Sequence, residues 1–241
     1  AEILNREAVL TALRRVKACD PACGSGAYLL DMMHELLDIQ ARLLDMCDPD
    51  PHWVYRQKLE IIQNNLYGVD IEESAVNIAR LRLWLSLAVE LAKEQRPEPL
   101  PNLDFKIELG NSLLAPDPRG LQLRDPLVRK LQEKKVEYLS QHDQANKGQL
   151  REYIQQLYVQ IALWTYGDTT ARDGFDWAIR FAEVFIEGGF DIMISNPPYV
   201  RHELIKEPKH ILKENFPAIY SGAADLYCFS TLARCNRCAL R

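Results

Sequence analysis

The sequence has no apolar run long enough to cross a membrane. A membrane-spanning helix needs about 20 consecutive apolar residues, and charged residues interrupt every apolar stretch of these 241 residues well before that length. The N-terminus also lacks the basic segment and apolar stretch of a secretory signal. Both absences predict a cytoplasmic protein that does not bind membranes.

Cysteines at the spacing of a metal site are scarce. The chain has six cysteines, and Cys235 and Cys238 form one Cys-x-x-Cys pair without a second pair at zinc spacing. A structural zinc site draws on four ligands, and cysteines of intracellular α/β proteins are typically free thiols. We therefore predict no metal site.

Positive charge is not in excess either. The chain has 29 Lys and Arg against 34 Asp and Glu, a net charge of −5. Because DNA affinity depends on neutralising phosphates, a DNA-binding role would need a local basic strip or a separate binding module. The cluster of Lys130, Lys134 and Lys135 is interleaved with Glu133 and Glu137, which favours a solvated helix face over a phosphate site.

What the sequence does have is an Asn-Pro-Pro-Tyr tetrapeptide at residues 196–199, directly after the apolar run 190–195. Such a run predicts a buried strand, and two prolines end it because they donate no backbone hydrogen bond. We expect a stiff turn at the carboxyl end of a strand, the edge where open α/β sheets bind ligands. On four residues alone, a turn that merely terminates a strand is an equal alternative.

This turn suits the chemistry of an exocyclic amine, whose lone pair is delocalised into a flat base. The side-chain oxygen of Asn196 and the carbonyl of Pro197 can each accept one amine hydrogen. The nitrogen would thereby be held while its lone pair localises towards an electrophile. Tyr199 would stack on the base, a contact worth roughly 1–3 kcal/mol.

A glycine-rich turn, Cys-Asp-Pro-Ala-Cys-Gly-Ser-Gly at residues 19–26, follows the strand-like stretch 16–18 and precedes an amphipathic helix. Glycines let a ligand approach the backbone closely. Leu29 stands at the third small-residue position of a dinucleotide fingerprint, and no P-loop lysine follows. The turn therefore predicts a nucleoside ligand without a pyrophosphate, and S-adenosylmethionine fits.

Together, residues 20–26 and 196–199 resemble the amino-methylating DNA methyltransferases that act on adenine, above all those of type I and type IIG restriction-modification systems. Residues 66–71, 107–113 and 222–227 agree with that pattern, so the similarity extends from about residue 16 to about residue 229. The resemblance implies a Rossmann-like S-adenosylmethionine-dependent methyltransferase fold, with a mainly parallel sheet and helices on both faces.

The resemblance also implies how the cofactor is held. Asp70 would accept hydrogen bonds from the ribose hydroxyls, a role compatible with capping the helix that follows, and Ile71 would pack on the adenine. Asn111 stands where the family usually has aspartate. The implied cofactor-binding residues are Asp20, Pro21, Ala22, Gly24, Gly26, Asp70, Ile71, Asn111, Ser112 and Leu113, and the implied catalytic residues are Asn196, Pro197, Pro198 and Tyr199.

Helical periodicity predicts an insertion at residues 115–172, between the third and fourth strands. The segments 127–139 and 150–164 both have this periodicity, which indicates an αα-hairpin. A shorter helix is predicted at about 177–186. Residues 45–58, which contain two prolines, are predicted to be a surface excursion.

Parts of the family's catalytic domain are not found in the sequence. No Tyr-Thr-Pro-like stretch precedes Val16, and neither a Lys-Pro-Gly-Gly-like turn nor a target-recognition domain follows Asp225. We therefore expect residues 1–241 to be a partial catalytic domain that lacks C-terminal strands and has little or no activity alone. Double-stranded DNA would be bound through the full-length protein or a specificity subunit, and further domains or subunits would associate with this one.

The predicted function is transfer of a methyl group from S-adenosylmethionine to the N6 amine of an adenine flipped out of duplex DNA, within a restriction-modification system. Two alternatives stay open. The same turn serves methyltransferases that act on glutamine or on ribosomal RNA. A non-catalytic, cofactor-binding module of a larger complex would share the glycine turn.

Overall fold

The structure is a computed structural model, which describes residues 5–90, 103–113, 125–141, 143–166, 175–196 and Lys213. The chain divides into two compact units, of which the first comprises residues 1–109 and 190–196 and the second residues 110–189 and 197–241. None of the helices in the described ranges is long and apolar enough to cross a membrane.

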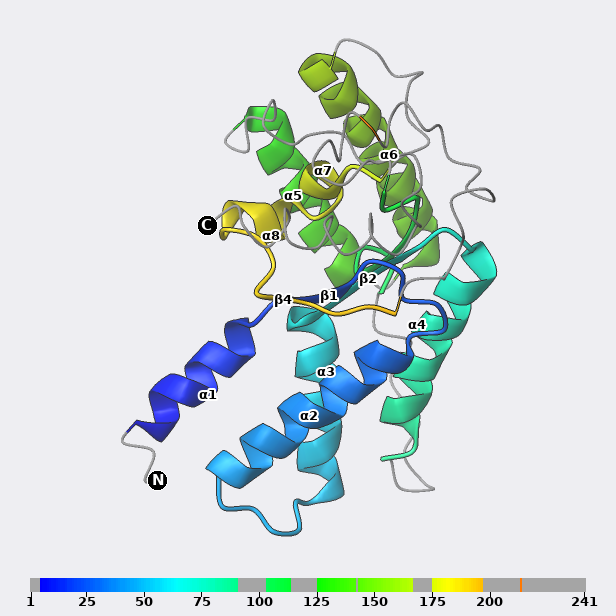
Figure 1. Cartoon of the computed structure of the whole chain (residues 1–241). Helices are drawn as coiled ribbons and strands as arrows, with labels where there is room; N and C mark the ends of the chain where they lie inside the picture. Colours follow the sequence, from blue (N-terminus) through cyan, green and yellow to red (C-terminus); the bar gives the residue numbers. More distant parts are fainter. Residues whose placement is uncertain are drawn as a thin grey trace. The chain divides into compact units, whose positions relative to one another are not determined.

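The first unit is built on a parallel sheet (Figure 1). Its described strands lie in the order β3-β2-β1-β4. Ala18 is opposite both Leu66 and Ile192, and Gly68 is opposite Ile107. Since all the pairings are parallel, the strands end at one common edge. The bounds are Ala18–Asp20 for β1, Leu66–Asp70 for β2, Ile107–Leu109 for β3 and Ile192–Met193 for β4.

Four helices belong to the same unit: α1 (Arg6–Arg15), α2 (Ala27–Leu43), α3 (Pro51–Asn64) and α4 (Glu73–Ala88). Helix α2 contacts β1 and β2, α4 contacts β2 and β3, and α2, α3 and α4 contact one another on one side of the sheet (Figure 1). All of β1 and most of β2 are buried, as is typical of parallel sheets. The predicted α/β fold with a parallel sheet flanked by helices is confirmed.

Helix α3 corrects the prediction for residues 45–58. The helix begins at Pro51, where a proline is favourable because the first turn needs no backbone donor. The carboxylate of Asp50 accepts hydrogen bonds from His52 N and Trp53 N at 3.2 and 3.3 Å, which caps the helix. The prediction of a surface excursion is therefore wrong from Pro51 onwards, where the chain is helical, whereas residues 45–50 form the loop between α2 and α3.

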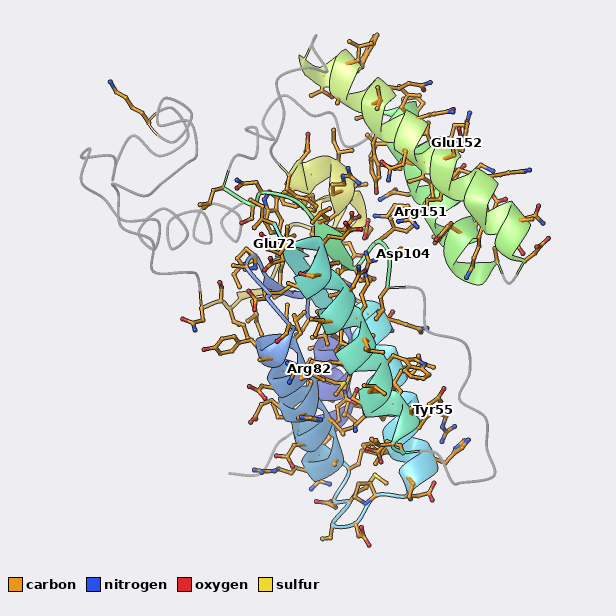
Figure 2. All side chains as sticks on the ribbon, turned by 90° about the vertical axis from the view of Figure 1, so that its right-hand side faces the viewer. Tyr55, Glu72, Arg82, Asp104, Arg151 and Glu152 are labelled. Carbon is orange, nitrogen blue, oxygen red and sulfur yellow. The ribbon has the colours of Figure 1, made fainter. Side chains whose placement is uncertain are left out.

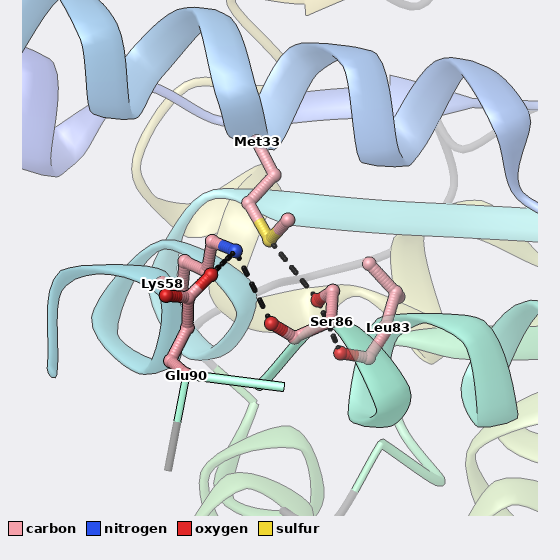
Figure 3. A network of polar contacts seen from close by, with 5 residues as sticks. All are labelled: Met33, Lys58, Leu83, Ser86 and Glu90. Atoms are coloured by element: carbon pink, nitrogen blue, oxygen red, sulfur yellow. Dashed lines mark hydrogen bonds and ion pairs between the residues drawn. The ribbon is translucent and has the colours of Figure 1, made fainter. Parts of the chain in front are cut away.

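Lys58 of α3 takes part in a polar network that joins three helices (Figure 3). Its side chain is buried, and its Nζ donates to Ser86 O at 3.2 Å and to Glu90 Oε1 at 2.5 Å. The hydroxyl of Ser86 donates to Leu83 O at 2.6 Å and contacts Met33 Sδ at 3.7 Å. The buried charge thus has the partners that make its burial tolerable.

The second unit contains the predicted helical hairpin. Helix α5 (Pro126–Ser140) and helix α6 (Gln144–Tyr166) contact each other along the hairpin (Figure 1). The predicted helix at 177–186 is split into α7 (Trp177–Arg180) and α8 (Ala182–Ile186), with Phe181 between them at φ −114° and ψ 42°. Aromatic rings form the core beside them: Phe175 lies 5.1 Å from Trp177 and 5.3 Å from Phe181, centroid to centroid.

The lysine cluster of α5 divides into two kinds of side chain. Lys135 is buried, and its Nζ donates to Arg180 O at 2.7 Å and to Glu183 Oε2 at 2.8 Å. The expectation of a solvated face is therefore wrong for Lys135, which joins α5 to the α7–α8 segment. Lys134 does lie on the outer side of the helix, where its Nζ donates to Glu137 Oε2 at 2.6 Å.

Candidate functional site

The glycine turn begins where β1 ends. The carboxylate of Asp20 accepts a hydrogen bond from Ala22 N at 3.0 Å, and Cys23 N donates to Val69 O of the neighbouring strand at 3.0 Å. Asp20 is almost fully buried. The turn is therefore fixed both to its own strand and to the carboxyl end of β2.

Two glycines give the turn its shape. Gly24 has φ +51° and Gly26 has φ +78°, values that other residues rarely adopt. A Cβ atom on Gly26 would lie 3.0 Å from the Cβ of Ala79 on α4, so the backbone there is in close contact with that helix. A Cβ atom on Gly24 would meet nothing within 4 Å. The turn thus packs tightly on one side and has open space beside Gly24.

Asp70 connects the turn to the end of β2. Its Oδ2 accepts a hydrogen bond from Gly24 N at 2.7 Å, and its Oδ1 accepts one from Glu72 N at 3.0 Å. Each carboxylate oxygen has a further lone pair and can still accept a hydroxyl. Ile71, the next residue, has 60% of its surface exposed. An acid and an exposed apolar side chain therefore lie together at this edge.

Cys23 is a neutral packing residue of the turn. Burial raises the pKa of its thiol far above the ordinary value, and the negative charges of Asp20 and Asp70 raise it further. A Cβ atom on Gly68 would lie 3.2 Å from its sulfur. The thiol therefore fills the space over β2 and stays protonated at physiological pH, which is unsuitable for a nucleophile.

Asn196 lies just beyond β4 at the same edge. Ile194 N donates to Cys19 O at 2.9 Å, so hydrogen bonding to β1 continues past Met193. Asn196 follows two residues later and is exposed. Pro197, Pro198 and Tyr199 lie outside the described residues, as do residues 222–227, and their predicted roles stay predictions.

Asn111, Ser112 and Leu113 belong to the second unit. The side-chain oxygen of Asn111 accepts a hydrogen bond from Leu113 N at 3.1 Å, and Ser112 O accepts one from Trp177 Nε1 at 3.3 Å. The oxygen predicted to meet the cofactor adenine thus already closes a local turn. This oxygen has a second lone pair, so the bond to Leu113 does not exclude the predicted contact, which stays a prediction.

The structure therefore brings Asp20, Gly24, Gly26 and Asp70 together at the carboxyl ends of two adjacent strands. Sequence reasoning missed a further residue, Arg82 on α4 (Figure 2). Its Nη1 donates to Ser25 Oγ at 3.0 Å and to Ser25 O at 3.2 Å. No local sequence signal marks this contact, because its partner Ser25 lies 57 residues earlier in the chain. Among the described residues, no three His, Cys, Asp or Glu side chains cluster as metal ligands would.

A parallel sheet with a glycine turn after its first strand and an acid at the end of its second is a Rossmann-like arrangement, and the family matches make it that of a methyltransferase. Residues 64–235 match the model of the Eco57I restriction-modification methylase family, and the chain belongs to this family. Residues 3–113 also match the MmeI DNA-methyltransferase domain.

Two curated relatives are each similar to less than half of this chain. A protein of Methanocaldococcus jannaschii, provisionally named a type II restriction enzyme and methyltransferase, is 44% identical over 111 residues, which are 45% of this chain and 9% of the relative. DNA methyltransferase A of Bacillus subtilis is 33% identical over 100 residues, 40% of this chain and 10% of the relative. The match thus spans about a tenth of the length of these relatives.

Proposed function

We propose that this chain is the catalytic part of a DNA adenine methyltransferase of a restriction-modification system, which transfers a methyl group from S-adenosylmethionine to the N6 amine of adenine. The observation that carries the proposal is the 2.7 Å hydrogen bond from Gly24 N to Asp70 at the carboxyl ends of β1 and β2, in a chain of the Eco57I methylase family. The DNA substrate is supported by the match to the MmeI DNA-methyltransferase domain and by the name of the Bacillus subtilis relative.

The residues of the turn fit the proposed cofactor. Open space beside Gly24 admits a ligand to the backbone, and the second lone pairs of Asp70 suit two ribose hydroxyls. Exposed Ile71 offers an apolar surface for a flat purine. Asp20 would meet the amino group of the methionine part. When bound, S-adenosylmethionine supplies an electrophilic methyl group on a sulfonium.

Asn196 would act on the target base. Its exposed side chain at the end of β4 can accept a hydrogen from the adenine amine, while the carbonyl of Pro197 accepts the other. This pair holds the nitrogen in line with the methyl group, so that the contribution is one of positioning. Tyr199 would stack on the base, which must leave the duplex because an attack on the methyl group cannot occur inside the base stack.

Methyl transfer by the full-length parent protein tests the proposal. Labelled S-adenosylmethionine and mixed-sequence DNA are the substrates, and digestion to nucleosides identifies the methylated base. We expect label in N6-methyladenine. Asn196→Ala should reduce turnover by about 100-fold or more, comparable with removal of one transition-state hydrogen bond, and should leave cofactor affinity within a few fold.

The matched control is Asn146→Ala. Asn146 is an exposed residue of α6 whose Nδ2 bonds to Asp143 at 2.9 Å, and its loss should leave turnover unchanged. Label in cytosine would contradict the adenine assignment. In parallel reactions with ribosomal RNA or a glutamine-containing protein in place of DNA, transfer to these and not to DNA would support the alternative substrates. Cofactor binding without transfer to any of them would indicate a non-catalytic module.

A further inference from the structure

We propose that Arg82 is a positioning residue that holds the glycine turn in the conformation required for cofactor binding; this inference rests on the proposed function. Arg82 lies in the middle of α4, between that helix and α2 (Figure 2). One guanidinium nitrogen donates to two acceptors of the same residue, Ser25 Oγ at 3.0 Å and Ser25 O at 3.2 Å. A donor that binds both the side chain and the backbone carbonyl of one residue restrains the orientation of the peptide group of that residue.

With this contact, three consecutive residues of the turn are each held by a different group. Gly24 N donates to Asp70, Ser25 accepts from Arg82, and Gly26 packs against Ala79. Of the three, Ser25 is the exposed one, so packing alone does not immobilise it. Arg82 supplies at Ser25 the restraint that burial supplies at Gly26.

Arg80, two residues earlier on α4, provides a natural comparison. Its guanidinium donates to Ile107 O at 2.5 and 3.1 Å and forms an ion pair with Asp104 at 3.2 Å. This arginine therefore attaches α4 to the start of β3, away from the glycine turn. The two arginines have the same chemistry and the same helix, but they restrain different segments.

The consequence for binding follows from the geometry of the turn. Gly24 N and Glu72 N together orient the carboxylate of Asp70, so displacement of Gly24 removes one of the two restraints on the group that would accept the ribose hydroxyls. Release of Ser25 frees the peptide next to Gly24. Only a fraction of the molecules then has the turn in the binding-competent conformation, and the apparent affinity for the cofactor falls in proportion to that fraction.

The experiment compares Arg82→Met and Arg82→Lys with Arg42→Met in the 241-residue chain. Arg42 is an exposed arginine of α2 that pairs with Asp38. Calorimetry measures the Kd for S-adenosylmethionine. We expect Arg82→Met to raise Kd by about 5- to 20-fold, the range for a partly exposed hydrogen bond to a charged group. Arg82→Lys should recover most of the affinity, and Arg42→Met should not change it.

Amide hydrogen exchange measures the same restraint without ligand. Exchange of the amides of residues 24–26 should accelerate in Arg82→Met and stay at the wild-type rate in Arg42→Met. Arg80→Met should accelerate exchange around β3 instead. Equal acceleration of the turn by Arg80→Met would show general loosening of α4 and overturn the inference.

The two measurements separate the inference from the proposed function. Absence of cofactor binding by the wild-type chain would contradict the proposed cofactor, whereas the exchange result would still decide the role of Arg82. Binding by wild type together with unchanged Kd and unchanged exchange in Arg82→Met would overturn the positioning role alone.

Discussion

The glycine turn after β1 and the lysine-rich helix α5 carry the polar residues that are most conspicuous in the sequence, but the structure uses them differently. In the turn, the carboxylates of Asp20 and Asp70 accept hydrogen bonds from backbone amides of loops. On α5, Lys134 pairs with Glu137, and Lys135 is buried against Glu183 and Arg180 O. The first set organises a loop, and the second holds helices together.

This difference shows that position along the fold is more informative than density of charge. The acids of the turn lie where parallel strands end, so their remaining hydrogen-bonding capacity faces the edge at which α/β sheets bind ligands. Lys134 and Lys135 of α5 lie within a hairpin, where intramolecular acids and a backbone carbonyl accept their hydrogen bonds. An open groove of about 790 Å³ beside them is lined in part by Lys130, Lys134 and Glu137, and its mixed charge gives little attraction for a phosphate.

The largest effect is expected from Asp70→Asn, which tests the functional side of this comparison. The side chain of asparagine can accept only at its oxygen, so one of the two backbone hydrogen bonds to residue 70 is lost. The –NH₂ group of the asparagine then faces the N–H of Gly24 or of Glu72, and two donors are opposed. We expect affinity for S-adenosylmethionine to fall about 100-fold, as for loss of charge-assisted hydrogen bonds. Calorimetry on the purified chain measures it.

Asp50→Asn is the matched control, because Asp50 also accepts from two backbone amides, His52 N and Trp53 N. Asparagine caps a helix about as well as aspartate, and this cap is on α3, away from the strand ends. Affinity should not change. If both variants lost affinity equally, the effect would reflect general destabilisation of the chain. The inference that Asp70 at the end of β2 binds the cofactor would then be refuted.

A smaller effect is expected from Lys135→Met, which tests the structural side. Removing one partner of a buried ion pair typically costs 3–5 kcal/mol, but Glu183 is one-third exposed and can recover solvation. We expect the free energy of unfolding to fall by about 2 kcal/mol in urea titration, with unchanged affinity for S-adenosylmethionine. Lys134→Met, which removes an outer pair on the same helix, should leave the unfolding midpoint at its wild-type value.

Much of the first unit could be predicted from sequence because its signals are local. The family motifs placed Asp70 at the end of a strand, and the glycines at residues 24 and 26 predicted a turn after β1; the structure gives both glycines a positive φ. Both features depend on residues adjacent in the chain. The hairpin of α5 and α6 was likewise predictable from its helical periodicity.

Other features were not predictable because they depend on distant partners or on a misread signal. The prolines of residues 49–51 indicated a loop, although Asp50 before Pro51 is also a helix start. The burial of Lys135 depends on Glu183, 48 residues later. The bond from Arg82 spans 57 residues to Ser25, and only the packing of α4 against the turn creates it.

The smallest effect concerns the thiol inside the turn. Burial and the nearby acids raise the pKa of Cys23 above its ordinary value, so the folded state keeps the proton that the unfolded chain releases above about pH 8.5. A raised pKa contributes stability that is complete below the unfolded value and is lost as the pH rises towards the folded one. The contribution of this thiol to the free energy of unfolding should therefore decrease as the pH rises above about 8.5.

Cys23→Ala isolates this contribution, because it removes the titrating group and leaves every other one. Urea titrations at pH 7.5 and pH 9.5 should show a loss of stability that is larger in wild type than in Cys23→Ala, by roughly 1 kcal/mol. Cys47→Ala, at an exposed cysteine of the α2–α3 loop, should behave as wild type. Equal alkaline losses in Cys23→Ala and wild type would mean that the thiol of the turn is not shielded, and the turn would have to be looser than its hydrogen bonds indicate.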